Sequence, residues 1–178
     1  MGNIIKSYKG ETNEKNERHG KGDAVFITGA TFSGIFENGR MKKGTYVWRS
    51  GDFYVGEMKM GSRNGFGKKT YVSGETIEGF WHNGKKHGLI KRTNNNTIYY
   101  SIWKYGSYIA EWEDFIPNKI VVAYCLKYGE IPSKNIKMNK DEDCTDEIIN
   151  LYISNQYHSD HHSDHHSDHH SDHHSDHH

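Results

Sequence analysis

The sequence lacks the features of a membrane-spanning or disulfide-bonded protein. It has no run of about 18 apolar residues, the length that a membrane-spanning helix requires. No apolar signal-peptide segment follows Met1. Cys125 and Cys144 are not spaced as a metal or redox pair, so we expect reduced thiols. Hydrophobic residues make up only 33% of 178 residues, too few for a large globular core but enough for a thin sheet. These features predict a soluble cytoplasmic protein of one domain.

The chain also has no net charge overall, but its charged residues are distributed unevenly. Residues 1–110 carry a net charge of +9, residues 111–158 carry −4, and the last 20 residues add five aspartates. A basic region of this kind suits anionic lipid headgroups or acidic protein surfaces. It equally suits a solvated polar face whose charges keep sheet edges from aggregating.

Glycine is abundant, and it recurs in columns every 22 to 24 residues. Aromatic or large apolar residues keep fixed offsets from these columns, as Tyr54 and Met58 do on either side of Gly56. Such self-similarity marks a repeat architecture in which only stacked units bury a core. The residues that define the repeats are Tyr8, Gly10, Gly20, Gly22, Phe32, Gly34, Gly39, Gly44, Trp48, Tyr54, Gly56, Gly61, Gly65, Gly67, Tyr71, Gly79, Trp81, Gly84 and Gly88.

Each unit is predicted to be a β-hairpin. Residues 54, 56 and 58 share one face because strand side chains alternate. The dipeptides Asn38-Gly39 and Asn83-Gly84 are typical of type I′ turns, in which both central residues need positive φ. Glycines on the returning strand leave room for the rings of the first strand.

The pattern Tyr-x-Gly-Glu-x-x-x-Gly-x-x-x-Gly-x-Gly resembles the MORN repeat (membrane occupation and recognition nexus), most closely over residues 54–76. Residues 8–30, 32–53 and 77–98 are variants, and residues 99–106 begin a degenerate fifth unit. The resemblance implies an all-β repeat fold, an elongated single antiparallel sheet of consecutive hairpins, often dimeric. In repeat four, Ile90 replaces the second glycine of the returning strand.

Three regions follow from these patterns: MORN repeats over 8–106, a C-terminal capping segment over 107–157, and a tail over 158–178. In the capping segment, Pro117 and Gly129 favour a helix over 117–128, although the β-branched run 120–122 also suits a strand. A second helix is predicted over 143–156, with acidic residues at its start and an apolar stripe. This helix would either cap the repeat stack or bind a partner.

The tail consists of five Ser-Asp-His-His copies, which cannot form a packed core, so we expect disorder. Its histidines could chelate a divalent metal adventitiously, whether the tail is functional, neutral or added. The candidate ligands are His161, His162, His165, His166, His169 and His170.

Two further motifs match their consensus only in part, which excludes the first and leaves acylation of Gly2 open. Residues 79–86 have the glycine and lysine spacing of a phosphate loop, but Lys86 stands where Ser or Thr is required. Residues 1–7 resemble a myristoylation site, but Ser7 comes one residue late.

The sequence therefore predicts a non-enzymatic protein without a cofactor. The resemblance implies a scaffold or adaptor at a membrane or cytoskeletal junction. It would bind either a protein partner or a second copy of itself, as a homodimer. Two alternatives are peripheral binding of anionic phospholipids and a role as the regulatory subunit of a kinase or methyltransferase. Nucleic acid is not expected, because the aromatic rings are needed for packing. The candidate residues for binding an anionic lipid or acidic partner are Arg40, Lys42, Lys43, Lys59, Arg63, Lys85, Lys86, Lys91 and Arg92.

Overall fold

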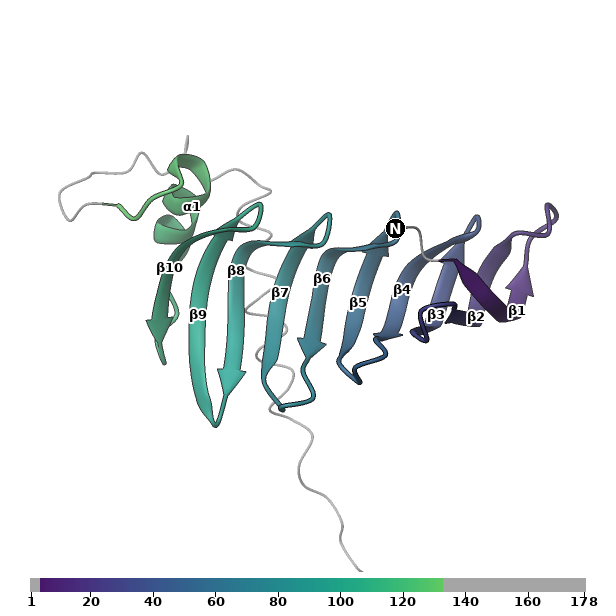
Figure 1. The fold of residues 1–178 in the computed structure, drawn as a ribbon. Helices are drawn as coiled ribbons and strands as arrows, with labels where there is room; N and C mark the ends of the chain where they lie inside the picture. Colours follow the sequence, from purple (N-terminus) through teal and green to yellow (C-terminus); the bar gives the residue numbers. More distant parts are fainter. Residues whose placement is uncertain (1–3, 133–178) are drawn as a thin grey trace, which may run out of the picture.

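The computed structural model describes residues 4–132, which form one open antiparallel sheet and a single helix (Figure 1). The ten strands pair in chain order, each with the one before it. This confirms the predicted elongated sheet of consecutive hairpins. The elements are β1 (Ile5–Thr12), β2 (Arg18–Phe26), β3 (Thr31–Glu37), β4 (Arg40–Val47), β5 (Phe53–Lys59), β6 (Ser62–Thr70), β7 (Thr76–His82), β8 (Lys85–Asn94), β9 (Thr97–Lys104), β10 (Ser107–Glu113) and α1 (Lys119–Tyr128).

The sheet extends beyond the region that shows the repeat in sequence. Strand β10 pairs with β9, so the fifth hairpin is complete although Ser101 replaces its leading glycine. Backbone pairing tolerates this change because Ser101 lies between Ile90 and Glu111, not between two glycines. The sheet therefore runs from Ile5 to Glu113.

The two-residue turns that join β3 to β4, β5 to β6, β7 to β8 and β9 to β10 have positive φ at both central residues. The values are 47° and 85° at Asn38-Gly39, and 48° and 79° at Asn83-Gly84. Met60-Gly61 and Tyr105-Gly106 adopt the same conformation. These are the predicted type I′ turns, whose twist matches that of the flanking strands.

Met60 is the poorest choice among these turn residues, because a long side chain at φ 52° costs about 1 kcal/mol. Replacing Met60 with Asn should raise the free energy of unfolding by about 0.5–1 kcal/mol, measured by urea denaturation. The reciprocal Asn83→Met change should lower it by a similar amount. A Met60→Asn protein that is less stable than the parent would contradict the assignment.

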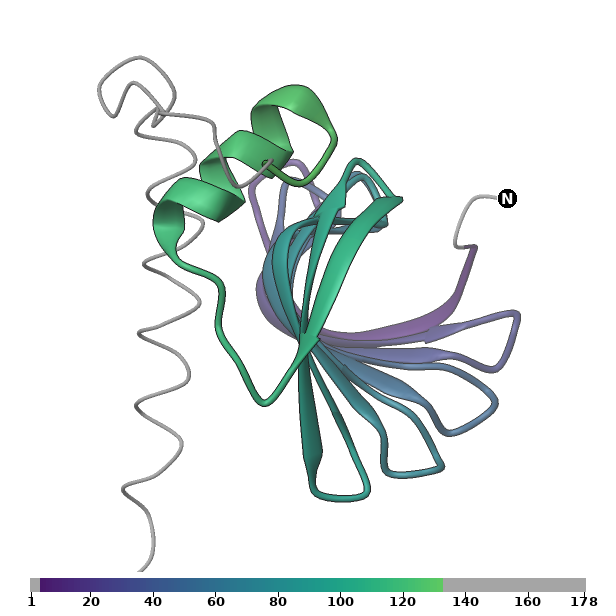
Figure 2. The same cartoon turned by 90° about the vertical axis from the view of Figure 1, so that its left-hand side faces the viewer.

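A β-bulge interrupts the register of each hairpin near its tip. In the third hairpin, Gly56 pairs with Gly67 and Met58 with Arg63, and Gly65, in the interrupted stretch of β6, has φ 91°. The Glu57 carboxylate accepts a hydrogen bond from the Phe66 N–H at 2.6 Å. Bulges bend the strands that carry them. Figure 2 shows the result, a sheet with a concave and a convex face.

The core of the repeats lies on the concave face and depends on a row of glycines. Seven glycines on β1 to β7 pair across successive strands, namely Gly10, Gly22, Gly34, Gly44, Gly56, Gly67 and Gly79. A Cβ atom at Gly67 would overlap the Tyr54 ring, which is fully buried. The Tyr54 hydroxyl donates to the Glu57 carbonyl at 2.8 Å, which satisfies its polar atom. Glycine here therefore provides space for a ring.

The row ends at Ile90 on β8, and the preceding strand explains why. Ile77 occupies the position that Tyr54 has in the third repeat, two residues before the leading glycine. Ile77 and Ile90 are both buried in the same core cluster. The smaller side chain on β7 thus leaves the space that Ile90 fills, so the departure is compensated within repeat four.

Helix α1 covers the convex face of the sheet near its C-terminal end (Figure 2). Val122, Cys125 and Leu126 pack against Leu89 and Ile102. Burial raises the pKa of the Cys125 thiol to about 11. The helix confirms the prediction over 117–128, beginning two residues later because the Asn118 side chain caps it.

Several predictions fall outside the described residues. They are the helix over 143–156, Cys144, and the tail over 158–178 with all six candidate metal-ligating histidines. Among residues 4–132, no helix is long and apolar enough to cross a membrane.

Candidate functional site

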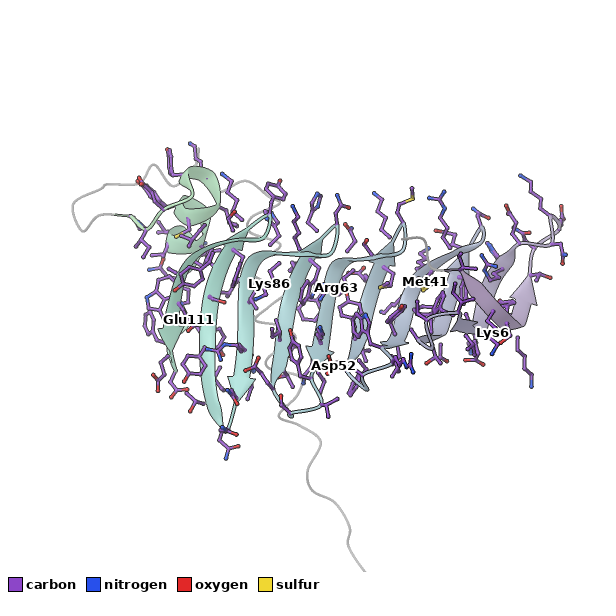
Figure 3. The ribbon with its side chains drawn as sticks, in the orientation of Figure 1. Lys6, Met41, Asp52, Arg63, Lys86 and Glu111 are labelled. Carbon is purple, nitrogen blue, oxygen red and sulfur yellow. The ribbon has the colours of Figure 1, made fainter. Side chains whose placement is uncertain are left out.

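Equivalent residues of successive hairpins form a line across the concave face. Met41, Arg63 and Lys86 each pair with the core residue that follows the leading glycine by two positions. Figure 3 shows these three side chains at the same height on neighbouring hairpins. The bulge sets this placement, because the register shifts between each of these pairs and the next pair along the hairpin.

Aromatic rings lie beneath the basic members of this line. The Arg63 guanidinium is 4.1 Å from the Trp81 ring centroid, and the Lys86 Nζ is 3.8 Å from that of Trp103. Lys69 on β6 contacts two further rings, at 4.7 Å from Trp48 and 4.4 Å from Tyr71. Cation–π contacts of this kind hold each charge over a ring. We call Trp48, Arg63, Lys69, Tyr71, Trp81, Lys86 and Trp103 the concave groove.

Two cavities give this groove its depth. One, of about 210 Å³, is lined by Tyr46, Trp48, Tyr54, Met58 and Arg63 among others. The next, of about 300 Å³, lies between Arg63, Lys69, Tyr71, Trp81, Lys86 and Trp103. Arg63 and Gly84 belong to both linings, so the cavities adjoin.

In the part of the chain that the structure describes, acidic residues lie near the groove cations without pairing with them: Asp52 favours the charged form of Lys69, and Glu75 and Glu111 favour that of Lys86. Arg63, Lys69 and Lys86 form no ion pair there, whereas Arg92 pairs with Glu75 at 3.5 Å and Glu111 at 3.3 Å. Figure 3 shows Glu111 at the β10 end of the same face. The groove is therefore positively charged along β6 to β8. The ion-paired residues Arg92, Glu75 and Glu111 lie toward its β10 end.

Burial makes these charges costly. It lowers the pKa of Arg63, and it is the main cause of the lowered pKa of Lys69 and of Lys86. Neighbouring cations add to the effect, Arg63 for Lys69 and chiefly Arg92 for Lys86. The charge of a bound anion would oppose these shifts, because an opposite charge nearby favours the protonated form.

The nine basic residues predicted from sequence lie on different surfaces. Arg63, Lys86 and Arg92 are on the concave face, where their strand partners include Met58, Trp81 and Ile77. Lys43 and Lys91 are on the convex face. The other four, Arg40, Lys42, Lys59 and Lys85, are near the hairpin tips. The structure does not bring the nine together.

Sequence reasoning missed Lys69. It precedes the aromatic residue Tyr71 by two positions, so strand alternation places both on one face. The alternation therefore indicates Lys69 as a neighbour of the ring, although it is absent from the nine predicted residues. The cation–π contacts themselves depend on neighbouring hairpins and could not be read from one repeat.

Comparison with protein families agrees with this architecture. The MORN repeat model matches residues 32–53, 54–76 and 78–89, which span β3 to part of β8. The search of curated proteins gives no match to this chain. MORN repeats are generally modules for interaction with proteins or membranes, and their all-β fold is typically non-catalytic. The pairing of β1 to β10 continues one hairpin pattern on both sides of the matched segment. The chain therefore contains MORN repeats within residues 32–89.

Proposed function

We propose that this protein is a non-catalytic scaffold that binds an acidic segment of a protein partner in the concave groove. It would act in the cytoplasm, as an adaptor at a membrane or cytoskeletal junction. The groove offers cations and rings, and none of its seven residues is a carboxylate, a cysteine, a serine, a threonine or a histidine. Such a surface suits the binding of an anion better than its chemical conversion.

One observation carries the proposal: Arg63, Lys69 and Lys86 are partly buried cations that form no ion pair among residues 4–132. Their burial lowers the pKa of each, so the charges destabilise the free protein. A ligand carboxylate would form charge-assisted hydrogen bonds with them. Apolar side chains of the same ligand would contact the rings of Trp48, Trp81 and Trp103, which belong to the groove.

The shape of the site favours a peptide over a membrane surface. Arg63, Lys69 and Lys86 line a cavity on the concave side of the sheet. Figure 2 shows that the sheet is bent, so a flat bilayer would meet the ends of its strands first. The remaining basic residues are divided between the tips and the convex face. No single plane contacts them all, which weakens the phospholipid alternative.

The test is a binding titration with a defined acidic probe, a 12-residue peptide of alternating Glu and Leu. Three of the four tryptophans lie in the groove, so intrinsic fluorescence reports occupancy. Lys69→Glu with Lys86→Glu should raise the Kd at least tenfold. Lys43→Glu with Lys91→Glu makes the same charge change on the convex face and should change the Kd less than threefold.

The same titration has a pH dependence whose sign follows from the lowered lysine pKa values. The anionic peptide binds the protonated amines, so affinity should be full at pH 7 and fall as the pH rises through those pKa values, below the ordinary 10.5. Combining Lys69→Arg with Lys86→Arg should remove this dependence, because a guanidinium stays protonated throughout the range.

Three results would contradict the proposal. Equal losses in the concave and convex variants would show that only net charge matters. Binding of a matched Lys and Leu peptide with the same Kd would exclude recognition of acid. Sedimentation with phosphatidylserine vesicles that depends on the convex pair, without peptide binding, would favour the lipid alternative.

A further inference from the structure

The convex face carries apolar side chains that α1 does not cover. Phe53 and Val55 on β5 are 37% and 47% exposed, and Ile35 on β3 is 36% exposed. Strand pairing places Val55 beside Lys68 and Ile35 beside Lys43. We call Ile35, Lys43, Phe53, Val55, Lys68 and Lys91 the convex patch.

The patch is continuous with the surface that α1 already occupies. Lys91 and Leu89 are two residues apart on β8 and therefore share the convex face, and Leu89 packs under α1. Between patch and helix, the rings of Phe66 and Phe80 contact edge to face at 5.5 Å, and Phe80 packs against the α1 cluster. A second element beside α1 would extend one apolar interface.

The patch also carries three lysines. Their strand neighbours on the same face include Glu57 and Glu78, but Lys43, Lys68 and Lys91 form no ion pair with any residue of 4–132. The chain itself contains a complementary segment. Residues 141–157 hold five acidic residues, all before position 148, and no Lys or Arg. After them comes the apolar stripe of Ile148, Ile149, Leu151, Tyr152 and Ile153.

This segment is close enough along the chain to reach the patch. The described chain ends at residue 132, just after α1 on the convex side, and position 143 is 11 residues further on. An extended chain of that length spans at most about 36 Å. The distance from β8 to β5 is three strand spacings, or about 15 Å.

We propose that residues 141–156 dock on the convex patch as a second amphipathic helix beside α1. The acidic start of the segment faces Lys43, Lys68 and Lys91, and its apolar stripe covers Phe53 and Val55. The convex face is then occupied by the chain's own C-terminal segment. The concave groove is left as the face that meets partners.

The test is zero-length carbodiimide coupling of the full chain, followed by peptide mass spectrometry. We expect intramolecular links from Lys43, Lys68 or Lys91 to Asp143, Asp146 or Glu147. Lys43 and Glu57 are strand neighbours, and their link serves as a positive control for the reaction. Lys15, at the tip of the first hairpin, should form no link to the segment.

Two matched variants separate docking from chance encounter. Ile149→Asp with Ile153→Asp removes the apolar stripe and should reduce the links at least fivefold. Asn150→Asp with Ser154→Asp adds the same charge on the opposite side of the predicted helix and should leave them unchanged. Equal loss in both variants would overturn the proposal.

The remaining outcomes also decide the question. Links between isotope-labelled and unlabelled copies would assign the patch to a second molecule instead. Links from the segment to Lys69 or Lys86 would place it in the concave groove. The absence of any link to the patch, with the Lys43 to Glu57 link present, would overturn the docking.

Discussion

Replacing Gly67 with isoleucine is expected to lower the free energy of unfolding by about 2–3 kcal/mol. A Cβ atom at this position overlaps the ring of Tyr54, whose side chain is fully buried. The backbone at Gly67 is ordinary, since its φ is not positive. The cost is therefore steric and falls on the ring. Urea denaturation measures it.

Repeat four supplies a natural test of this explanation, because it has Ile77 and Ile90 at the positions of Tyr54 and Gly67. The protein with both Tyr54→Ile and Gly67→Ile should lose less unfolding free energy than the two single variants together, by about 1 kcal/mol or more. Thr45→Ile on the convex face is the control and should cost no more than about 0.5 kcal/mol. Additive losses at positions 54 and 67 would contradict the packing argument.

Replacing Leu89 with aspartate is expected to release α1 from the sheet. Leu89 is 1% exposed beneath the helix, and a buried unpaired carboxylate costs several kcal/mol. The contacts of α1 with the sheet are mainly with β8 and β9. When the helix dissociates, the aspartate is hydrated, and the hairpins remain paired. The loss should be local.

Cys125 reports this release, because it lies on the face of α1 that is buried against the sheet and its pKa is raised to about 11. In a Cys144→Ser background, the thiol should react slowly with a disulfide reagent at pH 8 and at least tenfold faster after Leu89→Asp. The reactive species is the thiolate, which becomes accessible and more populated on exposure. Ile27→Asp, at a site that is 60% exposed, is the control. Unchanged reactivity with a reduced melting temperature would indicate global destabilisation instead.

Much of the fold was predictable because the repeat makes local rules agree. Asn-Gly pairs set the hairpin turns through their backbone conformation, and the Pro117 and Gly129 boundaries matched the ends of α1 within two residues. The columns of glycine and aromatic residues indicated one packed face. What they could not indicate was where the repeat stops, because Ser101 and the strand after it pair through backbone groups alone.

The candidate site was less predictable. Charge counting placed Arg63 and Lys86 in one set with Lys43 and Lys91, which the structure puts on the opposite face. Lys69 was not considered at all. Sequence patterns assign a residue to one side of its own strand, but bulges shift that alternation and the sheet bend determines which side becomes a groove.

The sequence by itself determined the architecture of this protein: consecutive hairpins, their turns, their buried rings, and the presence of MORN repeats. These depend on period and on local conformation, both of which repeat within about two dozen residues. Only the tertiary structure decided which cations lie over aromatic rings and form no ion pair among residues 4–132. Arg63 meets Trp81 and Lys86 meets Trp103 across hairpin boundaries, so their environment arises from stacking and from the curvature of the whole sheet.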